Sequence, residues 1–187
     1  MTELFVSDTQ ILGVKTVQRT RREDSRGFLQ RLFCQRDLQP VLSTREVKQI
    51  NHTNTKYAGT VRGLHFQLPP YAETKLVSCV RGEVWDVAVD LRADSPTFLH
   101  YHSQLISDSN QLSLLLPEGV AHGFQAMCDD CELVYLHTET YEPDFESGIN
   151  VLDEALNIPW PLPITELSER DQRLTFITGS FEGVTVT

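Results

Sequence analysis

The sequence predicts an all-β fold, a sandwich or jelly roll built from short antiparallel strands. Apolar and polar residues alternate with a period of two over several segments, which is typical of strands with one buried face. Turn-forming residues interrupt these segments at short intervals, and no helical period is sustained before the C-terminal third. In such folds a binding site lies between or inside the sheets.

Three segments carry the alternation most clearly: residues 83–91, 111–116 and 132–138. The side chains that share one face of each segment are Trp85, Val87, Val89 and Leu91 (opposite Asp86 and Asp90), then Leu112, Leu114 and Leu116, and finally Leu133, Tyr135 and His137. A strand places every second side chain on the same face. We therefore predict a strand in each segment.

Turns and short helices complete the predicted elements. Turn signals occur at residues 24–27, 81–82, 93–96, 117–119 and 129–130. Short helices are predicted to begin near residues 153–156 and 168–171. The second of them has a good N-cap in Ser168. The expected architecture is therefore a β fold with short helices near the C-terminus.

Size, charge and composition limit the possible functions. A chain of 187 residues with 40% hydrophobic content is long enough for one buried domain, which we expect to span residues 1–187. The net charge of −10 and the pI near 5.0 argue against a nucleic-acid or anionic-membrane partner. No basic and apolar leader and no run of roughly 18 apolar residues is found, so we expect a cytoplasmic protein without a membrane span.

The four cysteines do not suggest a disulfide framework, because they are few and irregularly placed. Cys128 and Cys131 have the spacing of half a zinc ribbon, but no second pair of cysteines or histidines completes four ligands. We interpret residues 128–131 as an acidic loop between strands.

One segment suggests carbanion chemistry. His65 follows Arg62 by three residues and precedes Lys75 by ten. A histidine can take a proton from the carbon beside a carbonyl, and fixed cations can stabilise the oxygen that becomes negative. The alternative is that His65 is a core histidine and that both cations lie in solvent.

Eight blocks of the sequence, in order and in register, resemble the dTDP-4-dehydrorhamnose 3,5-epimerase family: residues 24–28, 49–52, 61–67, 75–77, 81–90, 95–98, 117–124 and 167–171. The resemblance covers nearly the whole chain. It implies a cupin-type jelly roll that forms a homodimer and epimerises a nucleotide-linked 4-keto-6-deoxyhexose without a metal or organic cofactor. Such enzymes serve deoxysugar biosynthesis, including that of O-antigen.

The same resemblance implies roles for individual residues. His65 stands at the position of the general base, and Asp171 at that of the carboxylate that orients the base. Lys75 corresponds to the cation beside the C4 oxygen. Tyr135 corresponds to the acid that returns a proton from the opposite face. Further positions match substrate-binding residues, namely Arg26, Gln49, Asn51, Arg62, His122, Glu146 and Arg170, with Tyr141 stacking on the base.

Some positions depart from the family pattern. Arg31 stands where a glutamate is usual, which reverses a charge in the region that resembles the nucleotide pocket. Arginine donates hydrogen bonds and accepts none, so it suits cytosine better than thymine. Arg31 is therefore a candidate for choosing between CDP and dTDP, unless it points to solvent or to a phosphate. Thr140 replaces the first tyrosine of an adjacent pair, and Phe66 replaces another tyrosine. Leu136 and His137 replace a Lys-Cys-like pair.

Each residue role has a structural alternative. Without the resemblance, Tyr135 would be a core residue, Asp171 a capping-box residue, and Arg26 and Arg62 surface residues. His122 lies in a motif like the second metal motif of cupins, yet Gln67 replaces the second histidine that such a site needs, so we expect no functional metal. The other hypotheses are a single-centre epimerase of a CDP-sugar, a metal-dependent cupin oxygenase and a non-catalytic sugar-nucleotide-binding protein.

Overall fold

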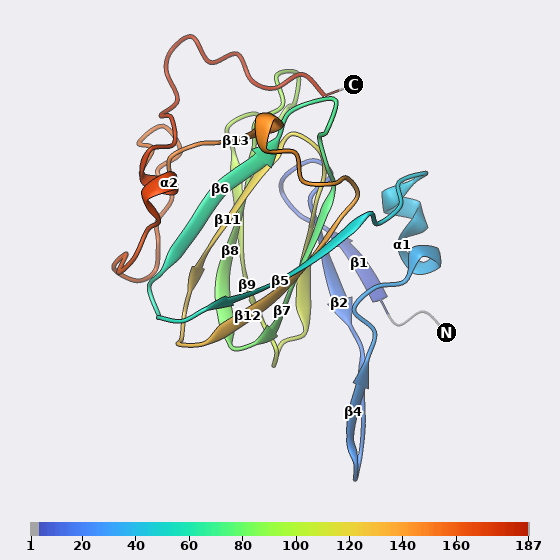
Figure 1. The fold of residues 1–187 in the computed structure, drawn as a ribbon. Helices are drawn as coiled ribbons and strands as arrows, with labels where there is room; N and C mark the ends of the chain where they lie inside the picture. Colours follow the sequence, from blue (N-terminus) through green and yellow to red (C-terminus); the bar gives the residue numbers. More distant parts are fainter. Residues whose placement is uncertain (1–3, 187) are drawn as a thin grey trace.

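Two antiparallel sheets face each other, and each is covered on its outer side by a different part of the chain (Figure 1). The computed structural model describes residues 4–186. Short antiparallel strands dominate the described chain, so the predicted all-β jelly roll is confirmed. Within this range no helix is long and apolar enough to cross a bilayer.

The first sheet has six strands in the spatial order β1-β2-β10-β7-β12-β5. Their bounds are Leu4–Asp8 for β1, Lys15–Arg19 for β2, Leu112–Leu116 for β10, Lys75–Arg81 for β7, Cys131–His137 for β12 and Gln49–Thr55 for β5. The alternation predicted at residues 111–116 and 132–138 therefore gives two neighbours of the central strand β7.

The second sheet has five strands in the order β13-β6-β11-β8-β9. Their bounds are Glu146–Gly148 for β13, Val61–Gln67 for β6, Val120–Ala126 for β11, Glu83–Asp90 for β8 and Tyr101–Ser107 for β9. A separate hairpin of β3 (Arg21–Asp24) and β4 (Gly27–Gln30) extends away from both sheets (Figure 1). The turn predicted at residues 24–27 closes this hairpin.

Three apolar clusters follow from the strand alternation. On β8, Val84 and Ala88 point between the sheets, whereas Val87 and Val89 point outward beneath the C-terminal segment. The outer side of the six-stranded sheet packs against helix α1 (Gln35–Leu42). Because both faces of these strands are buried, the three clusters hold four layers together: the C-terminal segment, the two sheets and α1.

The helices differ in part from the prediction. Helix α2 (Glu169–Gln172) begins after Ser168 as expected, with a short 3₁₀ helix η1 at Pro143–Phe145. The prediction was wrong at residues 153–156, which form turns because Asp153 accepts from the backbone N–H groups of Ala155 and Ile177. It also missed α1, whose buried face consists of only Leu38 and Leu42 and whose interior contains Pro40, a residue that usually ends helices.

A pair of glycines lets β6 and β11 approach closely. A Cβ atom on Gly63 would lie 2.5 Å from the Cα of Gly123, and Gly63 has a φ of +132°, which L side chains rarely adopt. A Cβ atom on Gly123 would lie 2.8 Å from the carbonyl oxygen of Arg62. His65 lies two residues after Gly63 and His122 one residue before Gly123, and the two histidines are direct cross-strand partners. The glycines therefore set the distance between two histidines.

Candidate active site

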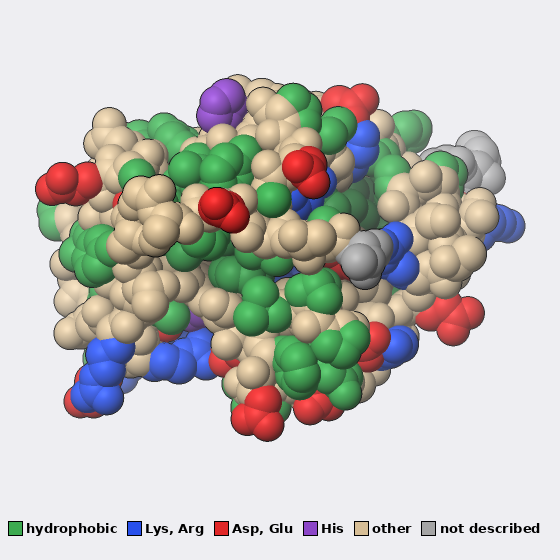
Figure 2. Space-filling view, turned by 90° about the horizontal axis from the view of Figure 1, so that it is seen from above, with side chains coloured by type: hydrophobic (Ala, Val, Ile, Leu, Met, Phe, Trp, Pro, Cys, Tyr) green, Lys and Arg blue, Asp and Glu red, His purple; other side chains and the backbone are tan. Residues whose placement is uncertain are grey.

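A cavity of about 610 Å³ opens between the two sheets. Its lining contains most of the predicted site residues: Asn51, Arg62, His65, Lys75, His122, Tyr135, Tyr141, Glu146, Arg170 and Asp171. They come from both sheets, from the segment before η1 and from α2, so segments far apart in the sequence converge here. The face of the molecule shown in Figure 2 carries its basic side chains in small groups mixed with acidic ones.

The inward face of β12 explains why the cavity forms at one end of the space between the sheets. Along this face, Cys131 and Leu133 lie in the apolar core, whereas Tyr135 and His137 line the cavity. On the neighbouring strand β7, Cys79 is likewise in the core and Lys75 in the cavity. The change from apolar to polar residues along each strand therefore marks the boundary of the site.

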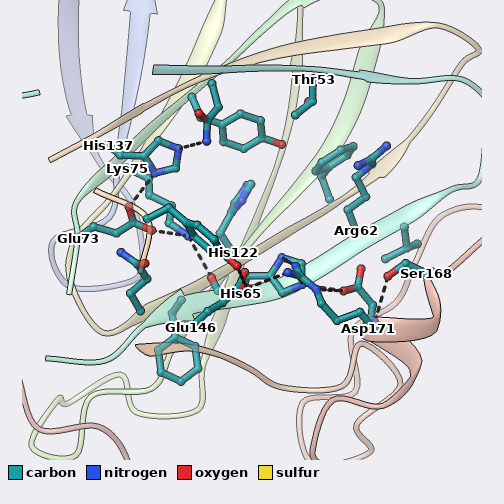
Figure 3. A pocket seen from close by; sticks show the side chains of 18 of the residues that line it. Thr53, Arg62, His65, Glu73, Lys75, His122, His137, Glu146, Ser168 and Asp171 are labelled. Atoms are coloured by element: carbon teal, nitrogen blue, oxygen red, sulfur yellow. Dashed lines mark hydrogen bonds and ion pairs between the residues drawn. The ribbon is translucent and has the colours of Figure 1, made fainter. Parts of the chain in front are cut away.

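His65 and Asp171 form a hydrogen-bonded pair in the cavity wall. The Nε2 atom of His65 lies 2.8 Å from Oδ1 of Asp171, which is only 3% exposed (Figure 3). Burial alone would raise the pKa of Asp171, but its contacts with His65, with the N–H of Gly63 and with Arg170 together outweigh burial and lower that pKa. An ionised carboxylate can only accept, so neutral His65 carries its hydrogen on Nε2 and keeps a lone pair on Nδ1.

Helix α2 fixes the position of Asp171. The Ser168 hydroxyl accepts a hydrogen bond of 3.1 Å from the backbone N–H of Asp171. This N-cap confirms the predicted helix start, but the Asp171 side chain bonds to His65 and to the N–H of Gly63. The capping-box interpretation of the Asp171 side chain is therefore wrong: only its backbone belongs to the cap.

Arg170 lies over the imidazole of His65 and links it to acidic residues. Its Nη2 atom is 3.1 Å from Nε2 and 3.5 Å from Nδ1 of His65. Its Nη1 atom lies 2.8 Å from Oε2 of Glu146, which also accepts a hydrogen bond of 2.7 Å from the Tyr141 hydroxyl. Arg170 and Tyr141 are both exposed, so a ligand can reach them.

Lys75 is almost buried in the cavity, and its ammonium group has two protein acceptors. The Nζ atom lies 3.0 Å from Oε1 of Glu73 and donates to the carbonyl oxygen of His65 at 3.4 Å (Figure 3). The second oxygen of Glu73 lies 2.7 Å from Nδ1 of His137. The predicted cation is therefore present, and it belongs to a charged cluster that the sequence did not reveal.

Tyr135 and His122 come from opposite sheets and meet edge to face, with ring centroids 6.0 Å apart. Burial raises the pKa of the Tyr135 phenol, so this group is protonated at neutral pH. The Nε2 atom of His122 contacts both oxygens of Asp86, at 3.0 and 2.9 Å. In the described part of the chain, no group of three or more His, Cys, Asp or Glu residues is arranged to hold a metal ion.

Three predicted substrate-binding residues are not in the cavity lining of this chain. Arg26 lies at the tip of the hairpin, where it pairs with Asp24 because the two-residue turn brings them together. Arg31 follows β4 and contacts Asp37 of α1, with Nη1 3.1 Å from Oδ2. Gln49 lies behind the lining and bonds to two residues that form it, Asn51 and Tyr141.

Sequence reasoning missed Glu73, Asp86, Thr53 and Phe124 as cavity residues or as their direct partners, and gave His137 no role. A signal existed for some of them. Asp86 and Asp90 share a face of a strand whose other face is apolar, and Glu73 precedes Lys75 by two residues.

The residues around 128–131 do form a turn between β11 and β12, as expected. The Sγ atoms of Cys128 and Cys131 lie 3.5 Å apart there as free thiols.

Comparisons with known proteins agree with this geometry. The family model for dTDP-4-dehydrorhamnose 3,5-epimerase matches residues 8–178. A dTDP-4-dehydrorhamnose 3,5-epimerase from Shigella flexneri is 43% identical over 149 residues, which cover 79% of this chain and 82% of that protein. A dTDP-4-dehydrorhamnose 3-epimerase from Streptomyces niveus is 39% identical over 163 residues, covering 87% and 78% respectively.

A solved structure is also similar. The dTDP-6-deoxy-D-glucose-3,5-epimerase from Legionella pneumophila, in complex with dTDP-4-keto-L-rhamnose, has a TM-score of 0.90 and 32% sequence identity, over 98% of this chain and 99% of that one. The fold, the site and these matches define an epimerase of the cupin-type jelly-roll class. The chain belongs to the dTDP-4-dehydrorhamnose 3,5-epimerase family.

Proposed function

We propose that this chain inverts C3, C5 or both in a dTDP-linked 4-keto-6-deoxyhexose. The observation that carries the proposal is the arrangement of four cavity residues. His65 on one sheet is paired with Asp171 of α2, and Tyr135 and Lys75 lie on the opposite sheet. Inversion needs a base on one face of the sugar and an acid on the other. An imidazole and a phenol on opposite walls meet that need.

In the proposed mechanism, Nδ1 of His65 takes the proton from the carbon beside the C4 ketone. Asp171 holds the ring in the required tautomer and stabilises the imidazolium that forms. The electron pair moves onto the C4 oxygen, where the Lys75 ammonium stabilises the enolate. Tyr135 then returns a proton from the opposite face. Arg170 has to leave the imidazole for this step, and the diphosphate of the substrate would attract it.

The nucleotide is proposed as dTDP because the matched relatives and the bound ligand of the Legionella pneumophila structure carry that name. Within this chain Arg31 contacts Asp37 of α1, and this contact gives no support to the hypothesis that Arg31 favours CDP. Titration of dTDP and CDP against the wild type and Arg31→Glu tests it. Equal relative affinities in both proteins would leave Arg31 without a role in nucleotide choice.

Deuterium incorporation tests the reaction itself. The protein is incubated in D₂O with dTDP- and CDP-linked 4-keto-6-deoxyglucose, and the deuterons are located by mass spectrometry and NMR. Deuterium at C3, C5 or both, together with inverted product, supports the proposal and decides between a 3-epimerase and a 3,5-epimerase. Absence of exchange with both substrates would overturn it.

A Tyr135→Phe variant tests the two-face mechanism. The ring is kept and the acid is lost, so proton abstraction should survive better than inversion. The expected signature is solvent exchange with little epimerised product. Normal inversion by this variant would assign the protonation to another group.

The hairpin of β3 and β4 supports a homodimer. Phe28 and Leu29 are 61% and 71% exposed on it, and an isolated two-stranded hairpin is marginally stable in water. A second copy of the chain would cover these side chains and could receive Arg26 in its own cavity.

The four free thiols are compatible with the expected cytoplasmic location.

Complementation tests this arrangement. Arg26→Ala and His65→Ala subunits are unfolded and refolded together, so that mixed dimers form. If Arg26 acts on the partner, one site in each mixed dimer has both residues and activity returns. If Arg26 acts on its own site, or the protein is a monomer by sedimentation, no activity returns and the arrangement is wrong.

A further inference from the structure

Glu73, Lys75 and His137 form a cluster of three titratable residues in the cavity lining (Figure 3). Their exposed fractions are only 8%, 9% and 9%. His137 on β12 is the direct cross-strand partner of Lys75 on β7, and Glu73 precedes β7 by two residues. The fold therefore brings two cationic or potentially cationic side chains to one carboxylate.

The hydrogen bonds order these groups in a row. Glu73 accepts from Lys75 on Oε1, at 3.0 Å, and contacts Nδ1 of His137 through Oε2, at 2.7 Å. Nε2 of His137 lies 3.4 Å from the amide nitrogen of Asn51. Burial would raise the pKa of Glu73, but the hydrogen bond from His137 and the charge of Lys75 lower it further than burial raises it. Glu73 is therefore an ionised carboxylate that can only accept.

The Lys75 ammonium has three hydrogens, and one of them is donated to Oε1 of Glu73. A second is directed to the carbonyl oxygen of His65, at 3.4 Å. With two hydrogens directed to protein oxygens, the third is available to a ligand oxygen in the cavity that Lys75 lines. A lysine side chain has four rotatable carbon bonds, so these two acceptors restrict a group that would otherwise adopt many positions.

We propose that Glu73 and His137 are positioning residues, which hold the Lys75 ammonium where the C4 oxygen of the substrate becomes negative. The inference rests on the proposed function of Lys75 as the enolate cation. Glu73 acts through Lys75, and His137 acts through Glu73 by fixing the carboxylate in one orientation. A preorganised cation stabilises a developing charge without having to reorganise during the reaction.

The role of Glu73 is a matter of hydrogen bonding, and this makes a specific prediction for two variants. Glu73→Ala removes both acceptors and should lower kcat about ten- to a hundredfold, as expected for loss of hydrogen bonds to a charged group, while KM changes little. Glu73→Gln keeps an acceptor oxygen for Lys75 and should recover most of the activity. His137→Ala should have a smaller effect, and His137→Asn, whose amide can replace Nδ1–H, should reverse it.

Epistasis with Lys75 distinguishes positioning from a merely structural role. In a Lys75→Met background, Glu73→Ala should cause no further loss of kcat, because the group it positions is already absent. The matched control is Glu139→Ala, which removes another Lys–Glu ion pair, with Lys48, outside the cavity lining. The control should keep wild-type kinetics, and thermal unfolding of every variant checks that it is folded.

The readout is deuterium exchange and kcat with the substrate that the wild type turns over. If the wild type exchanges no protons, the proposed function fails first. If the wild type is active, wild-type kcat in Glu73→Ala, a loss confined to KM, no recovery in Glu73→Gln, or full additivity with Lys75→Met would each overturn the positioning role.

Discussion

Two buried aspartates, Asp90 and Asp171, have the same charge and nearly the same burial but different numbers of partners. Asp90 receives Nε and Nη2 of Arg92, at 2.8 Å each, together with the hydroxyls of Ser95 and Thr97. Asp171 has His65 at 2.8 Å, with the N–H of Gly63 at 3.4 Å and Arg170 at 3.6 Å. The first carboxylate is saturated by short bonds, whereas the second has one short bond, to an imidazole in the cavity.

We interpret this difference as one between a structural site and the proposed reactive site. Asp90 holds the 90–97 loop through Arg92, Ser95 and Thr97, and it is not part of the cavity lining. Asp171 orients an imidazole whose other nitrogen has a lone pair. Both lie in blocks that resemble the epimerase family, so the resemblance alone does not tell them apart. The pattern of hydrogen bonds does, and the following variants test it.

The largest effect is expected for His65→Ala. Removing the proposed base should nearly abolish deuterium exchange while the protein stays folded, because the imidazole lies in the cavity wall beside Asp171 and Arg170 and is not part of the apolar core. The matched control is His52→Ala, since His52 is an exposed histidine paired with Glu132 outside the cavity. Exchange at the wild-type rate in His65→Ala would remove this residue from the mechanism.

Lys75→Met should follow in size. It deletes the cation and roughly keeps the stem, and loss of a fixed electrostatic stabiliser typically lowers kcat ~10²–10³-fold. The affinity for the substrate should fall less than kcat. If kcat were unchanged and only affinity fell, Lys75 would be a phosphate ligand and the cavity would need another cation for the enolate.

The two aspartates are compared directly as Asp171→Asn and Asp90→Asn. Asp171→Asn should lower kcat at least about a hundredfold, by analogy with other orienting carboxylates, with a small effect on stability. Asp90→Asn should leave kcat unchanged and cost about 3 kcal/mol in the free energy of unfolding, because Arg92 loses its buried partner. Urea unfolding and steady-state kinetics of both proteins measure the contrast, and equal losses of activity would break it.

The smallest effect concerns pH. Burial would raise the pKa of Asp90, but hydrogen bonds from Arg92, Ser95 and Thr97 outweigh it, so the folded pKa lies below the ordinary value of 3.8. Its contribution to stability is therefore present above that ordinary value and is lost as pH falls through the folded pKa. The stability difference between wild type and Asp90→Asn should shrink on acidification below about pH 4. A constant difference would show that Asp90 titrates normally.

The sequence predicted the β architecture because alternation and turns are local signals. Strands β8, β10 and β12 lie where the period of two placed them, and Ser168 caps α2. Helix α1 was missed because only two of its residues, Leu38 and Leu42, are buried, and the packing that stabilises it comes from a distant sheet. Local patterns do not report such tertiary contacts.

The candidate site was predicted less evenly, for a similar reason. The pairing of His65 with Asp171 crosses 106 positions and was expected only through the family resemblance. Glu73 and His137 lie 64 positions apart and become partners through the pairing of β7 and β12. Arg26 and Arg31 have suitable chemistry, yet the hairpin carries one away from the cavity and Asp37 binds the other. Chemistry is visible in a sequence, whereas orientation depends on the fold.

The glycine pair of β6 and β11 has a consequence for how this enzyme can change. At Gly63 and Gly123 even a methyl group would meet backbone atoms within 3 Å. In a saturation-mutagenesis library these two positions should therefore tolerate few substitutions, although neither has a side chain that takes part in the reaction. The spacing of the two strands that carry His65 and His122 therefore depends on positions that have no side chain at all.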